Sequence, residues 1–266
     1  MELGFAGATA VVTGGTQGMG FAAAMCLARD GAKVGVLART QADLDRSVDA
    51  LLEAGAADAV GLRADLLDKE SVDGAFALVG ERWDGRLNAL VNATGPSGAM
   101  RPFEEMTDQD FIDAVEIGCL SHIRCVRAAL PLLRAAEWAR VVNVSAHSTK
   151  RQSPDLIAYT AAKAMLTSVT KNLSMTLAPD EILVNTVSPG SFATETFKSW
   201  AASVGIDPDD LYACMRAIDE NFGHPAQMPR AGDPNEIGPV IAFAASRLNS
   251  YMTGANINVD GGSDFC

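Results

Sequence analysis

The sequence predicts one α/β domain built on a parallel sheet of about seven strands. Short, near-continuously apolar segments alternate with segments of helical composition along most of the chain, as expected when crossover helices bury both faces of a sheet. Glycines gather at the first strand-to-helix junction, where sheets of this kind bind ligands. A chain of 266 residues can form one large core, so we expect a single domain over residues 1–266.

The first half of the chain repeats a strand followed by a helix. Runs rich in Val, Leu and Ala predict strands at 9–15, 32–39, 59–66 and 87–95. Helical composition predicts helices at 20–31, 41–54, 68–82 and 107–134, and a glycine ends the first of them. This alternation is typical of a parallel sheet with crossover helices.

The second half continues the alternation. It predicts strands at 139–145, 182–190 and 254–262, and helices at 154–178 and 233–246. Ser153 and Pro154 suit the N-cap and first turn of the helix at 154–178, and Pro179 ends it. Residues 191–229 interrupt the rhythm with a long segment rich in aromatic residues. Long insertions of this kind are usually functional, so we expect a substrate loop here, within the single domain.

Charge and cysteine content exclude several classes of protein. Acidic residues outnumber basic ones 33 to 21, which disfavours binding to nucleic acid or to an anionic membrane. No apolar run approaches the length of a spanning helix, and the N-terminal segment lacks the basic residues of a signal peptide. The five cysteines, an odd number without C-x-x-C spacing, favour thiols in a reducing compartment over disulfides or a metal site. They are Cys26, Cys119, Cys125, Cys214 and Cys266. We therefore expect a cytoplasmic protein without a metal.

Two local patterns carry the functional prediction. "TGGTQGMG" at 13–20 lies between a strand and a helix, where glycines let the backbone approach a phosphate at a helix N-terminus. A purely structural turn would explain the same glycines. Tyr159 precedes Lys163 by one helical turn on one face, an arrangement that also occurs in ordinary surface helices.

Several motifs occur in one order along essentially the whole chain, and together they resemble the short-chain dehydrogenase/reductase family. The motifs are Thr13-Gly14-(x)3-Gly18-x-Gly20, Asp65-Leu66, Asn92 with Gly95, Tyr159-(x)3-Lys163, Ser188-Pro189-Gly190 with Thr194, and the closing "TGANINVDGG". The resemblance implies a doubly wound Rossmann fold, a nicotinamide cofactor and hydride transfer to a carbonyl or from an alcohol. It implies that Tyr159 exchanges a proton with the substrate oxygen, and that Lys163 binds the nicotinamide ribose and lowers the pKa of Tyr159.

The chain departs from the family at two catalytic positions. Ala146 stands where the family usually has its carbonyl-binding serine, and Gly118 where it usually has an asparagine. Ser145, Ser148 and His147 are candidates to replace the serine, and we favour Ser145. Loss of one such donor typically costs on the order of a hundredfold in rate. His147 is interpreted as a loop histidine near the carboxyl edge of the sheet rather than a catalytic base, and His122 and His224 are interpreted in the same way.

The end of the second predicted strand indicates the cofactor. NAD-binding folds typically carry an acid there, whereas a phosphorylated ribose needs an arginine, and this chain has Ala38-Arg39-Thr40. We predict NADP(H) as the preferred cofactor, with NAD(H) possible; Arg39 could alternatively begin a loop. The predicted cofactor-binding residues are Gly14, Thr16, Gln17, Gly18, Met19, Gly20, Arg39, Thr40, Asp65, Leu66, Asn92, Gly95, Tyr159, Lys163, Pro189, Gly190 and Thr194.

The sequence says less about the substrate and the oligomeric state than about the cofactor. Aromatic and methionine residues in 191–229, with Met100 and Phe103, favour a bulky, largely apolar small molecule, although they could equally pack the loop itself. The resemblance implies a homodimer or homotetramer, with the helix around Val126 as a contact. We therefore predict an NADP(H)-dependent oxidoreductase. The alternative is a protein of the same fold whose chemistry has decayed, acting as a cofactor sensor or assembly subunit.

Overall fold

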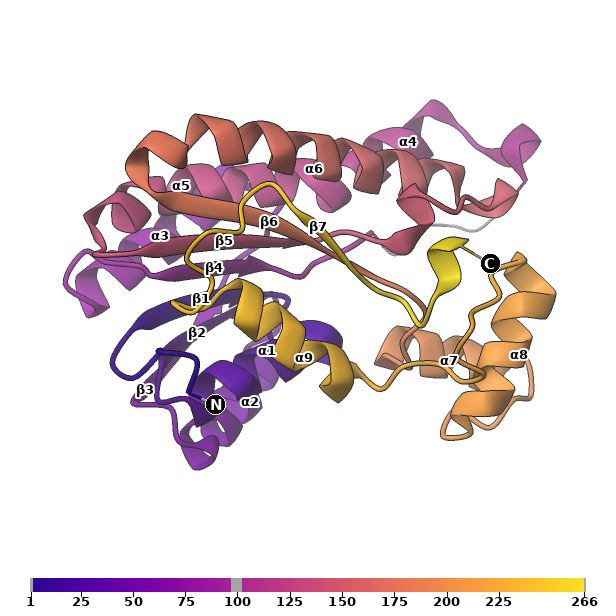
Figure 1. Ribbon diagram of the computed structural model, residues 1–266, viewed down its shortest axis with the longest axis horizontal. Coiled ribbons are helices and arrows are strands. Elements are labelled where there is room, and N and C mark those ends of the chain that lie inside the picture. Colours follow the sequence, from indigo (N-terminus) through magenta and orange to yellow (C-terminus); the bar gives the residue numbers. More distant parts are fainter. Residues whose placement is uncertain (1, 97–101, 266) are drawn as a thin grey trace.

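Seven parallel strands form one sheet with helices on both faces in the computed structural model, which describes residues 2–96 and 102–265 (Figure 1). The strand order is β3-β2-β1-β4-β5-β6-β7, and each neighbouring pair is parallel. This confirms the predicted doubly wound Rossmann fold. The strands are β1 Thr9–Thr13, β2 Lys33–Ala38, β3 Asp58–Arg63, β4 Ala89–Asn92, β5 Ala139–Val144, β6 Ile182–Pro189 and β7 Asn256–Val259.

Helices cover both faces of this sheet. Helices α3, α4, α5 and α6 lie on one face and α1, α2 and α9 on the other, while α7 and α8 extend beyond one end of the sheet (Figure 1). The helices are α1 Gly18–Arg29, α2 Gln41–Ala54, α3 Lys69–Arg82, α4 Asp108–Val115, α5 Ser121–Ala135, α6 Ile157–Thr176, α7 Glu195–Ser203, α8 Leu211–Phe222 and α9 Pro234–Ala244.

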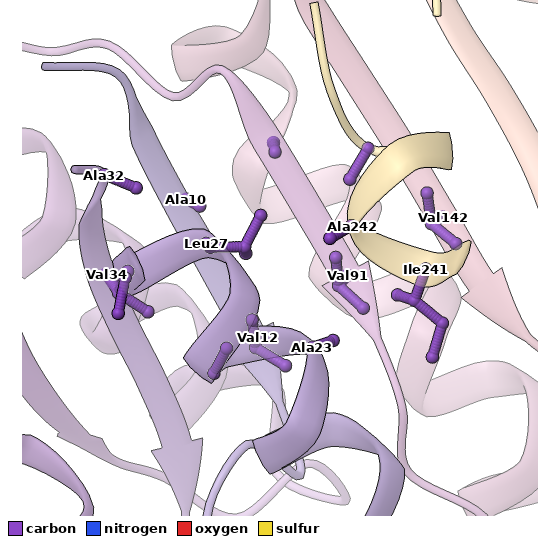
Figure 2. Close-up of a cluster of buried hydrophobic side chains, with 14 of the residues drawn as sticks. Ala10, Val12, Ala23, Leu27, Ala32, Val34, Val91, Val142, Ile241 and Ala242 are labelled. Atoms are coloured by element: carbon purple, nitrogen blue, oxygen red, sulfur yellow. The ribbon is translucent and has the colours of Figure 1, made fainter. Parts of the chain in front are cut away.

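The core between α1, α9 and the sheet explains why the strands read as continuous apolar runs. Val12, Val91 and Val142 project from β1, β4 and β5 toward Leu27 of α1 and Ile241 of α9 (Figure 2). All five side chains are fully buried. A second cluster on the opposite face includes residues of α3 and α5, so each central strand is buried on both sides.

Two predicted helices differ in detail from the structure. The helix expected at 107–134 is divided by a π-helical turn, Glu116–Leu120. Gly118 lies in that turn, and a Cβ there would be 3.0 Å from Cβ of Ala162 and 3.2 Å from Cδ of Pro96. This turn packs closely against α6, so a side chain at position 118 would require Ala162 or Pro96 to shift by a few tenths of an ångström.

The helix that carries Tyr159 begins later than predicted. A 3-10 turn, Pro154–Leu156, precedes α6, which starts at Ile157. Ser153 makes no side-chain capping bond, so its predicted role as the N-cap of this helix is wrong. The proline begins the tighter turn instead, because its fixed φ suits a first turn and its missing N–H needs no partner there.

Residues 191–229 contain α7 and α8, which are short helices rather than an irregular loop. The four cysteines of the described residues are free thiols, and no group of three or more potential metal ligands occurs among those residues. Cys266 lies outside them. Within the described ranges, every helix is too short or too polar to cross a bilayer.

Candidate functional site

One cavity of about 360 Å³ lies at the carboxyl end of the sheet. β1 pairs with both β2 and β4, and the chain runs in opposite directions across the sheet from this point. Doubly wound folds bind ligands at such a switch point. The cavity walls come from the segments that follow β1, β4, β5 and β6, together with α6, α7 and α8.

The glycine-rich turn forms a narrow cradle beside this cavity. Gly14 and Gly18 have φ values of +64° and +55°, which side chains rarely permit. A Cβ on Gly20 would lie 2.4 Å from the carbonyl oxygen of Gly14. The turn leads into the N-terminus of α1, where Gln17 makes no side-chain capping bond. Because this cradle is open to a phosphate group, the turn fits a dinucleotide.

A second hollow lies at the ends of β2 and β3. Arg39, Arg63, Asp65 and Ser71 line it together with Ala64. The Ser71 hydroxyl accepts from the backbone N–H of Asp65 at 3.0 Å, which ties the loop after β3 to α3. Two guanidinium groups at one hollow fit a phosphorylated ribose, and Arg63 was not among the predicted site residues.

Tyr159 and Lys163 both line the cavity at the carboxyl end of the sheet. The Lys163 ammonium is 2% exposed and donates to the backbone carbonyls of Thr94 at 3.1 Å and Val144 at 2.8 Å. Burial lowers the pKa of Lys163 to about 7. The two carbonyls fix its position between β4, β5 and α6.

The expected lowering of the Tyr159 pKa is wrong for the ligand-free chain. Burial raises the pKa of Tyr159 to about 12, and Lys163 is not among the causes of the shift. The tyrosine therefore keeps its proton at neutral pH. This state suits a donor to a carbonyl oxygen, which is the role needed in reduction.

Ser145 and Ser148 differ in whether their hydroxyl groups are already hydrogen-bonded within the protein. The Ser145 hydroxyl donates to the backbone carbonyl of Lys163 at 3.0 Å and lies 2.9 Å from Oγ1 of Thr167, so it is engaged with α6. The Ser148 hydroxyl also lines the cavity, is buried, and has no hydrogen-bond partner within the described ranges. Ser148 is thus the less committed donor of the two.

Other predicted residues divide between the cavity and the core. Those that line the cavity are Met19, Gly95, Pro189, Gly190 and Thr194. Asn92 is fully buried and donates to Oδ1 of Asn143 at 2.9 Å, and Leu66 packs in the core. These two side chains face the protein interior. Thr16, Gln17 and Thr40 lie at the ends of α1 and α2, outside both linings.

The aromatic residues after β6 both line the cavity and pack against one another. Phe197, Trp200 and Phe222 form two consecutive ring contacts with centroids 5.3 and 5.1 Å apart, and with Phe192 they line the cavity. Tyr212, in contrast, is 52% exposed. Phe103 is 63% exposed and outside the lining, and Met100 lies outside the described residues. An apolar wall is therefore built mainly by the segment 191–229.

Sequence reasoning named His147 only as one candidate for the serine role and interpreted His224 as an ordinary loop histidine, so it missed that the two residues meet. His147 and His224 both line the cavity, and their ring centroids lie 5.1 Å apart at an angle of 75°. The residues are 77 positions apart in the chain, and no local spacing joins them. The interpretation of His122 as a loop histidine is wrong, because it lies in α5 and is buried, where its Nε2 donates to the Thr94 carbonyl at 2.9 Å.

Comparisons with known proteins agree with this geometry. The family described as Enoyl-(Acyl carrier protein) reductase matches residues 14–264. The chain is 31% identical to a 2,3-dihydroxy-2,3-dihydro-p-cumate dehydrogenase from Pseudomonas putida, over 97% of this chain and 94% of the relative.

Solved structures with the same fold have nicotinamide cofactors bound. One is L-sorbose reductase from Gluconobacter frateurii complexed with NADPH and L-sorbose, with a TM-score of 0.90, 25% identity and full coverage of both chains. Another is an NAD+-bound xylitol dehydrogenase, with a TM-score of 0.85, 26% identity, and coverage of 97% of this chain and 99% of the other.

The buried ammonium predicts a pH-dependent stability difference. Between pH 7 and pH 9 the unfolded chain holds a proton on Lys163 that the folded chain has largely released, so the free energy of unfolding attributable to this group rises with pH. Relative to Lys163→Met, the wild type should gain about 2 kcal/mol over that interval, measured by urea unfolding. Lys69→Met, at an exposed position, serves as the control, and parallel profiles for wild type and Lys163→Met would contradict the buried-lysine description.

Proposed function

Because the chain belongs to the short-chain dehydrogenase/reductase family, we propose that it is an NADP(H)-dependent oxidoreductase of carbonyl and secondary alcohol groups. The observation that carries the proposal is the cavity that Tyr159 and Lys163 share with Met19 of the glycine-rich turn and with an apolar wall. Its substrate is a small molecule that is bulky and largely apolar. The aromatic side chains of α7 and α8 support this substrate class, since they supply most of the wall.

The cofactor preference rests on the second hollow. Arg39 and Arg63 line it together, and two guanidinium groups favour the phosphate of NADP(H) over the bare ribose of NAD(H). Asp65 lines the same hollow, which is compatible with some binding of NAD(H). The relative complexed with NADPH and the relative bound to NAD+ support both possibilities in this fold.

The proposed mechanism gives each cavity residue a distinct task. The bound nicotinamide supplies or accepts the hydride. Tyr159 holds the proton that the substrate oxygen receives in reduction. Lys163 is oriented by the carbonyls of Thr94 and Val144, and it is placed in the cavity wall to bind the nicotinamide ribose. Ser148, whose hydroxyl is uncommitted, takes the carbonyl-binding role that Ala146 cannot perform.

Assembly is part of the proposal, and we propose a homodimer or homotetramer. Val126 itself is 4% exposed and belongs to the core, because this face of α5 packs toward α3 and the sheet. A contact through the helix around Val126 would therefore use its exposed face, which includes Arg127, Pro131 and Arg134. Tyr251 is 96% exposed and Leu248 is 47% exposed, and both follow α9. These apolar groups favour a contact there.

The experiment that tests the function is the Tyr159→Phe variant. It should lower kcat for NADPH-dependent ketone reduction by about 10²–10⁴-fold, the usual contribution of a positioned acid. The affinity for NADPH, measured by fluorescence titration, should stay nearly unchanged. Comparable turnover in the variant would remove Tyr159 from its role. Tight NADPH binding by the wild type without any turnover on a broad ketone panel would favour the cofactor-sensing alternative, which Ala146 and Gly118 support.

The two serines provide a second test of the mechanism. Ser148→Ala should lower kcat by on the order of a hundredfold, because it removes a donor to the developing oxyanion. Ser145→Ala is the matched control and should change kcat less, since its hydroxyl bonds to α6. The reverse order of effects would return the role to Ser145.

Cofactor choice is tested by Arg39→Asp. The substitution removes a charge-assisted bond and adds repulsion toward the ribose phosphate, so the ratio of kcat/KM for NADPH over NADH should fall by at least about tenfold. Steady-state kinetics with both cofactors measure it. An unchanged ratio would exclude Arg39 as a phosphate ligand.

A further inference from the structure

Two buried histidines meet across the substrate cavity without using all of their hydrogen-bonding capacity. His147 belongs to a 3-10 turn after β5, and His224 follows α8. They are 6% and 4% exposed, and both line the cavity that contains Tyr159. Nε2 of each ring has no hydrogen-bond partner within the part of the chain that the structure describes.

The bonded nitrogens fix which ring atoms carry the protons. Nδ1 of His147 lies 3.1 Å from the carbonyl oxygen of Pro189. His224 is hydrogen-bonded to the backbone of Gln152, and since its Nε2 has no partner, the bonded nitrogen is Nδ1. A carbonyl oxygen can only accept, so each Nδ1 donates and each Nε2 is left with a lone pair.

Both rings are neutral at physiological pH. Burial lowers the pKa of His224 to about 4, with contributions from the neighbouring His147 and Arg151. Burial also lowers the pKa of His147, against the opposing effect of the Pro189 carbonyl and of Asp260. Two residues of the cavity wall therefore each keep one ring nitrogen that can accept a hydrogen bond, whereas Tyr159 and Ser148 carry hydroxyl donors. Buried acceptors normally have donors, and here a ligand can supply one.

We propose that His147 and His224 bind a hydroxyl group of the substrate, so that the preferred substrate is a hydroxy ketone, and the preferred alcohol a diol, on a largely apolar frame. This inference rests on the proposed function, because Tyr159 and Ser148 are taken to bind the carbonyl oxygen. All four residues line the same cavity, and His147 immediately precedes Ser148 in the chain. The hydroxyl is accordingly close to the carbonyl, as in an α-hydroxy ketone. The reaction itself is unchanged, and the pair determines which ketones are accepted.

The test compares two ketones that differ by one hydroxyl. The probes are 1-hydroxy-1-phenylpropan-2-one and 1-phenylpropan-2-one, each with NADPH. The wild type should favour the hydroxylated ketone in kcat/KM by at least about a hundredfold, because a site built to bind a hydroxyl discriminates strongly against its absence. A ratio near one in the wild type would overturn the proposal, even if both reductions depend on Tyr159 and the oxidoreductase function stands.

Variants assign the preference to the histidines. His147→Phe and His224→Phe keep a ring but remove the acceptor, and each should lower the preference at least about tenfold. The loss should appear mainly as a higher KM for the hydroxylated ketone, and it is measured as the change in the ratio of kcat/KM between the two ketones. His224→Gln keeps an acceptor and should restore part of the preference, and it also serves if a phenylalanine variant fails to fold. An unchanged preference in the folded variants would overturn the assignment.

Binding separates this proposal from the proposed function. Calorimetry with the NADP+-loaded protein compares 1-phenylpropane-1,2-diol with 1-phenylpropan-2-ol. Tighter binding of the diol that is lost in His224→Phe would support the histidine pair, even if no ketone is reduced and the proposed function fails. Equal binding of the two alcohols would overturn the pair's role whatever the outcome for turnover.

Discussion

The hydrogen bonds from the Lys163 ammonium to the carbonyls of Thr94 and Val144 hold the candidate site together. Thr94 follows β4 and Val144 ends β5, so one side chain of α6 ties the helix to two central strands at their carboxyl ends. The same Thr94 carbonyl accepts from His122 of α5. Within the described residues, both acceptors of the Lys163 ammonium are neutral carbonyls. A buried charge that lacks an opposite charge is costly, and this cost lowers the pKa of Lys163.

A polar layer beneath Lys163 keeps these strand ends in register. Asn92 donates to Asn143 across β4 and β5, and Asn143 donates to Thr170 of α6, each at 2.9 Å. Buried amides of this kind are stable only when they are paired. The asparagine that the resemblance linked to the cofactor therefore acts through the scaffold, since its side chain is already used. Its effect on the site is to fix where Thr94 and Lys163 lie.

The sequence was sufficient for the fold because the apolar periodicity and the glycine turn are local signals. All seven strands were expected at nearly the observed residues, and the shared location of Tyr159, Lys163, the glycine turn and Thr194 follows from the parallel topology. The π-helical turn at Glu116–Leu120 and the pKa of Tyr159 could not be predicted. The π-helical turn depends on the fit of Gly118 against Ala162, and the pKa of Tyr159 depends on its burial. Both follow from the packing of the helices, which the sequence does not specify locally. The meeting of His147 and His224 depends likewise on where α8 docks.

The buried polar atoms that lack hydrogen-bond partners help to decide between an active enzyme and a protein of the same fold that has lost catalytic activity. Six buried side-chain atoms lack a partner within the described residues, and three of them, on His147, Ser148 and His224, line the one cavity. Each such group costs about 1–3 kcal/mol of stability, so folding alone gains nothing from gathering them there. Cofactor sensing needs the glycine turn and the arginine hollow, but it does not need three uncommitted polar atoms next to Tyr159. A cavity that keeps them beside an apolar wall is better explained by a bound substrate than by a site that only senses cofactor. The loss of the usual serine and asparagine then indicates a rearranged site, in which other residues bind the substrate oxygen.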